Sequence, residues 1–401
     1  MKRIQLALAA VWIIVSVSLF GCGDNKGSSL AVALPAAGDL VASSTAQASG
    51  IVGAASIVKL RYRMQAIGGG LTEANALLFA PPGSPPNGGW PLVVWAHGTT
   101  GVADSCAPSR NFAGLTEPAV ANALLAAGFA VLAPDYEGLD APGVHPYFIR
   151  SSHSNSVLSA VKAAQAVGST TVSKAWSIIG HSQGGHVALS AAQFASQLGT
   201  DFPLRGVVAL APGSDLVLSS NLAFQSIDAL ISAGDLNQAA EILFFVQLNG
   251  SFAIHGMRTV NPNLDVSRVF GTRMRPLFDM ALTDANCEAF GTAIINDLNA
   301  FLSGGGNLGS YPGFRRDWVT NNDFASIATA NRVGQVRLTA PVLVVQGSAD
   351  EQVPAGATTV LAQTLIANGT AVSLLDVPGG THNSIVIDTL PRAVAFLKAN
   401  R

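Results

Sequence analysis

The chain has 401 residues, of which 49% are hydrophobic and 11% are charged, and its formal net charge is -2. This length is enough for one large domain, or for a core domain with an insertion, that buries an extensive apolar centre. The weak net charge and the lack of a Lys/Arg cluster in the sequence remove the long-range attraction that nucleic-acid binding needs. We therefore expect no nucleic-acid partner.

The N-terminal residues have the layout of an export signal. Two basic residues precede an apolar run from Ile4 to Phe20, which predicts a signal peptide over residues 1–21. The run ends in Leu-Phe-Gly before Cys22, which resembles the sequence at which bacterial lipoproteins are cleaved and lipidated on the cysteine. Phe20 departs from the small residue usual there, so a plain signal peptide or an uncleaved anchor is the alternative. We expect an exported protein, either a lipoprotein of the outer membrane or cell surface, or a secreted protein.

Two segments lie between the predicted signal peptide and the region in which predicted strands and helices alternate. Residues 22–50 are mostly Ala, Ser, Gly and Pro, with little charge and no periodicity, which predicts a flexible, lipid-anchored tether. Residues Ile57–Gln65 then alternate apolar and basic side chains, and a second run, Ala74–Ala80, follows a triple glycine. This pattern predicts an antiparallel hairpin.

Beyond the hairpin, short apolar runs alternate with helix-length segments, which is typical of βαβ units around a buried parallel sheet. The predicted strands are Leu92–Ala96, Ala130–Ala133, Trp176–Ile179, Gly206–Ala211, Val342–Gln346 and Val372–Val377. The predicted helices are Glu117–Ala127, Ser154–Val167, Gly185–Leu198, Gly356–Ala367 and Pro391–Ala399. We therefore expect an α/β fold with a mostly parallel sheet and flanking helices.

The alternation stops between residues 213 and 336, where apolar and mainly helical sequence intervenes. The simplest interpretation is an insertion in the middle of a sheet domain. We thus expect a core made of residues 51–212 and 337–401, and a mainly helical insertion over residues 213–336.

Residues 176–190 carry the strongest chemical signal. An apolar strand leads into GHSQG at residues 180–184, and an Ala-rich helix follows. So sharp a turn strains the backbone at the serine and leaves room only for glycine two positions to either side. Free N–H groups and the positive dipole end at the helix N-terminus favour negative charge there. This context predicts Ser182 as a catalytic nucleophile rather than a capping serine in an ordinary turn.

A serine hydroxyl needs a base that takes its proton. In hydrolases with this strand–turn–helix arrangement, the chain order is serine, acid, histidine. Beyond the serine's own helix, the histidines are His255 and His382. His382 follows the last predicted strand, where a loop can carry it over the sheet edge, whereas His255 lies inside the insertion. We expect His382 to be the base and His255 to be a packed or solvated residue.

The acid must orient the imidazole and stabilise its charged form. Asp350 directly follows an apolar strand, at the edge where the active sites of parallel sheets gather. One helix and one strand fit between it and His382. Glu351 is expected to point away, and Asp376 lies too close to the histidine in sequence. We therefore predict Asp350 as the acid rather than a turn or capping aspartate.

Acyl transfer also needs donors for the developing oxyanion. The backbone N–H of Gln183, directly after the nucleophile, is the first candidate. The second is expected in the loop HGTTG at residues 97–101, after the first predicted parallel strand. We predict Thr99 as this donor, with Thr100 as the neighbour that replaces it or lines the pocket. Tyr136 follows the next strand at the same edge, and we expect it to form a pocket wall or to serve in packing.

Apart from Cys22, the chain contains Cys106 and Cys287. In an exported protein these two residues permit one disulfide, and the alternative is two unpaired buried thiols. Neither belongs to a Cys-x-x-Cys or Cys/His spacing, so a structural zinc site has no support and we expect no metal.

Taken together, these motifs resemble the secretory-lipase group of the α/β-hydrolases. The resemblance rests on residues 97–99 (HGT), 135–138 (DYEG), 180–185 (GHSQGG), 347–350 (GSAD) and 380–382 (GTH). It implies a helical cap over the acyl pocket, the triad of serine, aspartate and histidine named above, ester substrates and no cofactor. It also favours a disulfide between Cys106 and Cys287, which would tie the loop after the oxyanion strand to the cap.

We therefore expect a serine esterase or lipase that hydrolyses carboxylic esters, acylglycerols among them, through an acyl-enzyme. A serine at the elbow argues against dehalogenases and epoxide hydrolases, which carry aspartate there. A peptidase or an acyltransferase with the same triad is the alternative within the fold. A catalytically inactive surface-binding lipoprotein is the alternative outside the enzymes. The apolar run Ile242–Val246 favours an apolar acyl site, but it fits the core of the cap equally well.

Overall fold

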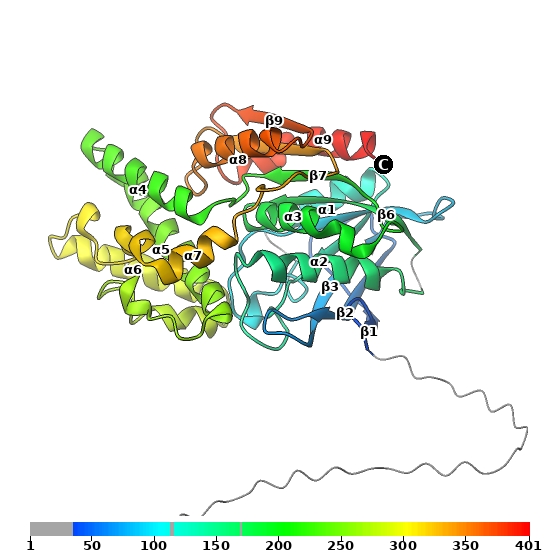
Figure 1. Ribbon diagram of the computed structural model, residues 1–401, viewed down its shortest axis with the longest axis horizontal. Helices are drawn as coiled ribbons and strands as arrows, with labels where there is room; N and C mark the ends of the chain where they lie inside the picture. Colours follow the sequence, from blue (N-terminus) through cyan, green and yellow to red (C-terminus); the bar gives the residue numbers. More distant parts are fainter. Residues whose placement is uncertain (1–34, 113–115, 169–170) are drawn as a thin grey trace, which may run out of the picture. The chain divides into compact units, whose positions relative to one another are not determined.

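The computed structural model describes residues 35–112, 116–168 and 171–401 (Figure 1). Cys22, the predicted signal peptide and the first part of the predicted tether lie outside these residues. Within the described residues the strands form one sheet of nine, in the order β1-β2-β3-β5-β4-β6-β7-β8-β9. Their bounds are β1 Leu40–Thr45, β2 Ser56–Gln65, β3 Leu71–Ala80, β4 Trp90–Ala96, β5 Ala130–Pro134, β6 Val172–His181, β7 Leu204–Leu210, β8 Val342–Gly347 and β9 Val372–Val377.

The strands from β5 across to β9 pair in parallel. Because side chains alternate between the faces of a strand, β4 sends Leu92 and Val94 into one apolar core and Val93 and Trp95 into the other. Burial on both faces explains why these strands are continuous apolar runs in the sequence. The predicted α/β fold with a mostly parallel sheet is confirmed.

The N-terminal part of the sheet is antiparallel. β2 pairs with β3 over its full length, and β3 joins the parallel strands through β5. The structure corrects the tether predicted over residues 22–50, because Leu40–Thr45 form the edge strand β1 beside β2. This strand is half-buried to exposed and has no apolar alternation. It is held by backbone pairing rather than by side-chain burial, so its sequence carried no strand signal.

Helices cover both faces of the sheet (Figure 1). On one face lie α1 Glu117–Ala126 and α9 Ser384–Ala399, and on the other lie α2 Arg150–Ala164, α3 Gln183–Phe194 and α8 Ala355–Ala367. The sequence predicted that the last helix begins at Pro391, but α9 begins at Ser384 and contains that proline. Pro391 is exposed, and so is Ile387, whose carbonyl loses its helical hydrogen bond, so this carbonyl can bind water instead.

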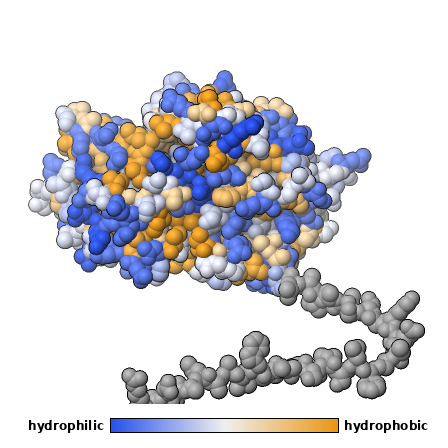
Figure 2. Space-filling view, in the orientation of Figure 1, coloured by the Kyte–Doolittle hydropathy of each residue, from blue (hydrophilic) through white to orange (hydrophobic). Residues whose placement is uncertain are grey.

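Residues 213–336, here called the cap segment, connect β7 to β8. Their helices are α4 Leu216–Ala233, α5 Leu236–Val260, α6 Ala289–Ser303 and α7 Asn322–Ala330. Their apolar side chains gather in a cluster of their own, with Phe270, Phe278 and Phe324 fully buried in it. Apolar and polar surface alternate over the part of the molecule that holds these helices, at the left of the view (Figure 2).

Candidate active site

The turn between β6 and α3 has the geometry of a nucleophile elbow. Ser182 occupies it with φ 57° and ψ -115°, a conformation that is costly for a residue with a side chain. A Cβ at Gly184 would overlap the carbonyl oxygen of Ala96, and one at Gly180 would overlap the carbonyl of Gly184. Only glycine fits at both positions, because the helix start, the elbow and the neighbouring strand approach one another too closely.

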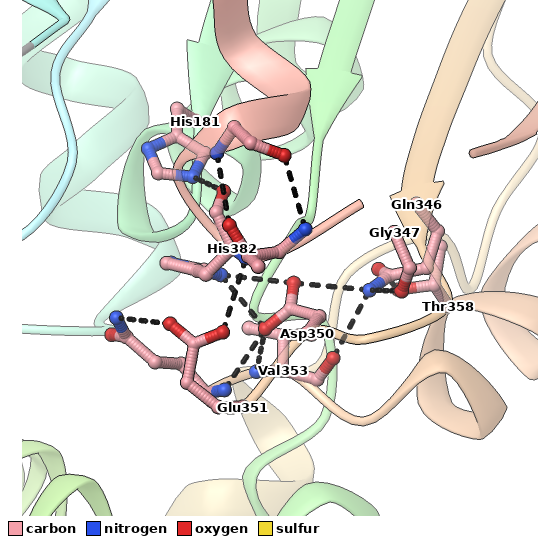
Figure 3. Close-up of polar contacts among 11 residues, drawn as sticks. His181, Gln346, Gly347, Asp350, Glu351, Val353, Thr358 and His382 are labelled. Atoms are coloured by element: carbon pink, nitrogen blue, oxygen red, sulfur yellow. Dashed lines mark hydrogen bonds and ion pairs between the residues drawn. The ribbon is translucent and has the colours of Figure 1, made fainter. Parts of the chain in front are cut away.

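The predicted acid and base lie together at the ends of β8 and β9. Nδ1 of His382 is 2.9 Å from Oδ2 and 3.0 Å from Oδ1 of Asp350 (Figure 3). The backbone N–H groups of Gln352 and Val353 donate to Oδ1 at 2.9 and 2.8 Å. Burial alone would raise the pKa of Asp350, but the hydrogen bond and charge of His382 and these two amides bring it below its usual value.

A buried glutamine completes the surroundings of Asp350. Nε2 of Gln346 donates to Oδ2 of Asp350 at 3.0 Å, and its Oε1 accepts from the hydroxyl of Thr358 at 2.6 Å (Figure 3). The carboxylate therefore has partners on both oxygens, and its orientation toward His382 is fully determined. Sequence reasoning missed Gln346, because one amide at the end of an apolar strand carries no motif.

Two further groups hold the loop of His382. Nε2 of the buried His181 lies 2.9 Å from the carbonyl oxygen of His382 (Figure 3), so Nε2 carries the proton and donates. Burial first, and the nearby His382 second, lower the pKa of His181 to about 3, so it stays neutral. Glu351, expected to point away, accepts a hydrogen bond from the backbone N–H of His382 at 3.2 Å.

Ser182 faces a cavity between the core and the cap segment. The cavity is lined mainly by apolar side chains of α4 and α5, among them Ala223, Ile242, Val246 and Ile254. Its polar lining consists of Ser182, Glu351 and Gln352, two serines of α4 (Ser219 and Ser220) and Asn249 of α5. Among the described residues the Ser182 hydroxyl makes no hydrogen bond, so its contact with His382 stays a prediction.

The two predicted oxyanion donors are backbone N–H groups. One belongs to Gln183, the first residue of α3, and the other to Thr99 in the loop after β4. Neither the backbone N–H of Gln183 nor that of Thr99 donates to another described residue. A Cβ at the neighbouring Gly98 would lie 3.9 Å from Cβ of Ser182, which places this loop beside the nucleophile. The Thr99 hydroxyl is 2.6 Å from the hydroxyl of Tyr147, and this contact fixes the loop against the cavity wall.

The other predicted pocket residues lie elsewhere. Tyr136 is fully buried, donates to the carbonyl oxygen of His97 at 3.0 Å and stacks on that ring. It does not line the cavity of Ser182, so its place corrects the pocket-wall expectation and favours the packing role. Thr100, together with Thr99, lines a separate surface cavity beside Cys106 and Cys287, and neither threonine lines the cavity of Ser182.

A disulfide joins Cys106 to Cys287, with Cα atoms 5.5 Å apart, so the predicted pairing is confirmed. It links the loop after β4 to the segment before α6 and thus fastens the cap segment to the core. Within the described parts of the chain, no group of three or more His, Cys, Asp or Glu residues is arranged to hold a metal ion.

Parts of the chain match two protein-family models, and its structure is similar to solved structures. A family model described as secretory lipase matches residues 111–243, and one described as prolyl oligopeptidase family matches residues 307–400. No curated protein matches the chain. Among solved structures, a rice cell wall degrading esterase LipA from Xanthomonas oryzae superposes with a TM-score of 0.70 at 19% identity, over 92% of this chain and 100% of that chain. The chain has the α/β-hydrolase fold.

Two other structures extend this likeness. A putative hydrolase from Legionella pneumophila has a TM-score of 0.69 at 18% identity, over 90% of this chain and 97% of that chain. Lipase A of Candida antarctica in its closed state has a TM-score of 0.67 at 16% identity, over 91% of this chain and 82% of that chain. The resemblance to secretory lipases is confirmed, and the first matched segment contains Ser182 while the second contains Asp350 and His382.

Proposed function

We propose that this α/β-hydrolase is a serine ester hydrolase that works through an acyl-enzyme. Two observations support the proposal: Ser182 is strained at the elbow and open to an apolar cavity that Glu351 and Gln352 also line, and these two residues directly follow Asp350, which pairs with His382. In this proposal Ser182 is the nucleophile, His382 the general base and Asp350 the group that orients and stabilises the imidazolium.

The reaction proceeds in two steps. Nε2 of His382 takes the hydroxyl proton as Oγ of Ser182 bonds to the ester carbonyl carbon, and the backbone N–H groups of Gln183 and Thr99 bind the oxyanion. His382 then gives the proton to the leaving alcohol as the carbon–oxygen bond breaks. In the second step His382 takes a proton from water, the hydroxide attacks the acyl carbon, and the acid leaves as Oγ regains its proton.

The cavity indicates the substrate class. Residues 213–336 form a cap over the acyl site in this proposal, and the apolar side chains of α4 and α5 provide a binding surface for an aliphatic acyl chain. We therefore propose carboxylic esters with an apolar acyl group as substrates. A peptidase is the second candidate, favoured by the prolyl oligopeptidase match over residues 307–400.

One set of measurements tests the proposal. A fluorophosphonate probe should label the protein, and peptide mapping should place the phosphonyl group on Ser182. p-Nitrophenyl esters should be hydrolysed far faster than aminoacyl p-nitroanilides. Absence of labelling on Ser182 would refute the proposed mechanism, and faster cleavage of the anilides would replace the esterase by the peptidase.

We also propose that the protein is exported and anchored to the cell envelope through lipid on Cys22. The Cys106–Cys287 disulfide supports export, because disulfides persist in oxidising compartments. Mass spectrometry of the mature N-terminus tests the anchor. A diacylated N-terminal Cys22 is the expected result, and a mature chain that begins at another residue contradicts it.

A further inference from the structure

Four histidines that the proposed mechanism does not use lie behind the nucleophile elbow. His97, His145, His153 and His186 are each no more than 1% exposed. Burial lowers the pKa of His145 to about 3 and of His97 and His186 to about 4, and it lowers the pKa of His153 strongly as well. All four rings are therefore neutral near pH 7, and each has one N–H donor and one acceptor nitrogen.

In a neutral histidine, the hydrogen-bond partner of one ring nitrogen determines whether the other ring nitrogen donates or accepts. Nδ1 of His145 is 2.8 Å from the carbonyl oxygen of Glu137, and a carbonyl only accepts, so Nδ1 carries the proton. Nε2 of His145 is then an acceptor. The side-chain Nε2 of Gln183 lies 2.8 Å from it and donates to it.

The same reasoning applies at the far end of the cluster. Nε2 of His186 is 3.0 Å from the carbonyl oxygen of Asn331, so it donates, and Nδ1 of His186 accepts from Nδ1 of His153 at 3.1 Å. Nε2 of His153 is then an acceptor, and it faces the amide nitrogen of Gln183 at 3.5 Å. One set of tautomers satisfies these contacts of His145, His153 and His186.

Gln183 links the buried histidine array, formed by His145, His153 and His186, to the nucleophile elbow. Its side chain is fully buried, and its amide nitrogen faces the acceptor nitrogens of both His145 and His153. Its Oε1 is buried and has no hydrogen-bond partner among the described residues, so the two histidines, rather than the amide oxygen, set the side-chain orientation. The same residue begins α3 and presents the free backbone N–H beside Ser182.

We propose that His145 and His153, backed by His186, are positioning residues that hold Gln183 so that its backbone N–H points at the oxyanion. This proposal rests on the proposed ester hydrolysis. Anchoring the side chain stops the first turn of α3 from rotating about the strained elbow, and an oxyanion donor is effective only when it is oriented before the reaction. Both ring nitrogens of His145, His153 and His186 have partners in this buried network, which makes it rigid enough for this task.

The array also connects the core to the cap segment. Asn331 is the residue at which α7 ends, and besides accepting from His186 through its carbonyl oxygen it accepts from the backbone N–H of Arg150 through Oδ1 at 2.9 Å. The last helix of the cap segment is therefore joined by a continuous chain of hydrogen bonds to the residue that provides the oxyanion donor.

Two substitutions at His145 test the proposal. In His145→Leu the acceptor for Gln183 is lost, so kcat for p-nitrophenyl butyrate should fall about tenfold while KM changes little. In His145→Gln an amide oxygen can replace Nε2 as the acceptor, so most of kcat should return. The Ki of an alkyl boronic acid, whose tetrahedral adduct on Ser182 places an oxygen in the oxyanion site, should rise in His145→Leu by a factor similar to the fall in kcat.

His255→Leu is the matched control. His255 is 2% exposed, and Nε2 donates to the carbonyl oxygen of Phe278 at 3.0 Å, but it lines no part of the cavity of Ser182. Its loss should lower Tm with kcat unchanged. An equal fall in kcat in His255→Leu and His145→Leu, or an unchanged kcat in a folded His145→Leu, would overturn the proposal.

If His145→Leu is poorly folded, a double-mutant cycle between His145 and Gln183 tests the proposal instead. Gln183→Met removes the side-chain amide and leaves the backbone N–H in place. His145→Phe keeps a ring at this position but removes the acceptor nitrogen. If the two side chains act as a pair, the combined loss in kcat of Gln183→Met and His145→Phe should be smaller than the product of the single losses. Fully multiplicative losses would refute the pairing. If the unmodified protein hydrolyses no ester, the proposed function fails instead, so the two failures are distinguishable.

Discussion

Nδ1 of His382 lies within 3.0 Å of both carboxylate oxygens of Asp350, and the carboxylate is fully buried. In Asp350→Asn the carboxylate that accepts from Nδ1 is lost, and the imidazole is no longer held in the tautomer that a base requires. We expect kcat for p-nitrophenyl butyrate to fall about 10⁴-fold. The control is Asp376→Asn, at an exposed carboxylate of β9, which should keep full activity. Comparable activity in both variants would show that Asp350 is not the acid.

Ser182→Ala should remove turnover and leave the fold intact. The substitution removes the proposed nucleophile but adds no atoms at the elbow, so kcat should fall on the order of 10⁴- to 10⁶-fold with little change in Tm. Circular dichroism and thermal melting check the fold, and labelling by the fluorophosphonate probe should disappear. Esterase activity retained at the level of the unmodified protein would disprove the mechanism.

The buried carboxyl of Asp135 should make stability depend on pH. Burial raises the pKa of Asp135 to about 7, and its Oδ2 has no partner among the described residues. Between its ordinary pKa of 3.8 and about 7, the folded protein binds this proton and the unfolded chain does not. The contribution of Asp135 to stability therefore falls as pH rises through this range.

Asp135→Asn removes this titration. The free energy of unfolding of the variant relative to the unmodified protein should be higher at pH 8 than at pH 5, by on the order of 2 kcal/mol. Denaturant unfolding at the two pH values measures the difference. Asp376→Asn serves again as the exposed control, and an equal change in both variants would contradict the assignment to Asp135.

Breaking the disulfide should loosen the cap segment. Cys106 and Cys287 are separated by 181 residues, so the bond restricts a large part of the unfolded chain. The double variant Cys106→Ala/Cys287→Ala should lose about 3 kcal/mol of unfolding free energy. Dithiothreitol should lower the Tm of the unmodified protein but not that of the double variant. Titration of two free thiols in the unreduced, folded protein would contradict the bond.

The cavity wall formed by α4 should limit acyl chain length. Ala223 and Leu216 both line the cavity, about 10 Å apart along the helix axis. Ala223→Phe should therefore lower kcat/KM for p-nitrophenyl dodecanoate about tenfold and leave that for the butyrate nearly unchanged. Ala233→Phe, at the exposed end of α4, is the control. Equal effects on both esters would place the acyl chain elsewhere.

The elbow and its partners were predictable because each has a local signature. Ser182 lies between glycines whose absence of side chains is required by the close approach of Ala96, and Asp350 and His382 each follow an apolar strand. The disulfide was predictable from a resemblance and not from spacing, because nothing in the sequence brings Cys106 toward Cys287. The edge strand β1 was not predictable, because it is held by backbone pairing with β2 and its own side chains have no apolar alternation.

The buried histidine array shows where local patterns stop being informative. His145 lies in a loop, His153 on α2 and His186 on α3, and only the packing of these elements brings their rings together. The interpretation of Glu351 failed for a similar reason. A side chain next to a catalytic aspartate is expected on the opposite side, but the turn after β8 brings its carboxylate to the backbone N–H of His382.

The residues of the proposed site lie on both sides of the cap segment in the sequence, so a proteolytic cut within that segment would separate them. Ser182 precedes the cap segment, whereas Asp350 and His382 follow it, so a cut at the exposed Asn263 would leave each of the two fragments with an incomplete set of the proposed site residues. The disulfide bridges that cut, because Cys106 belongs to the first fragment and Cys287 to the second. In an oxidising environment a nicked molecule would remain one covalent unit that contains all three residues.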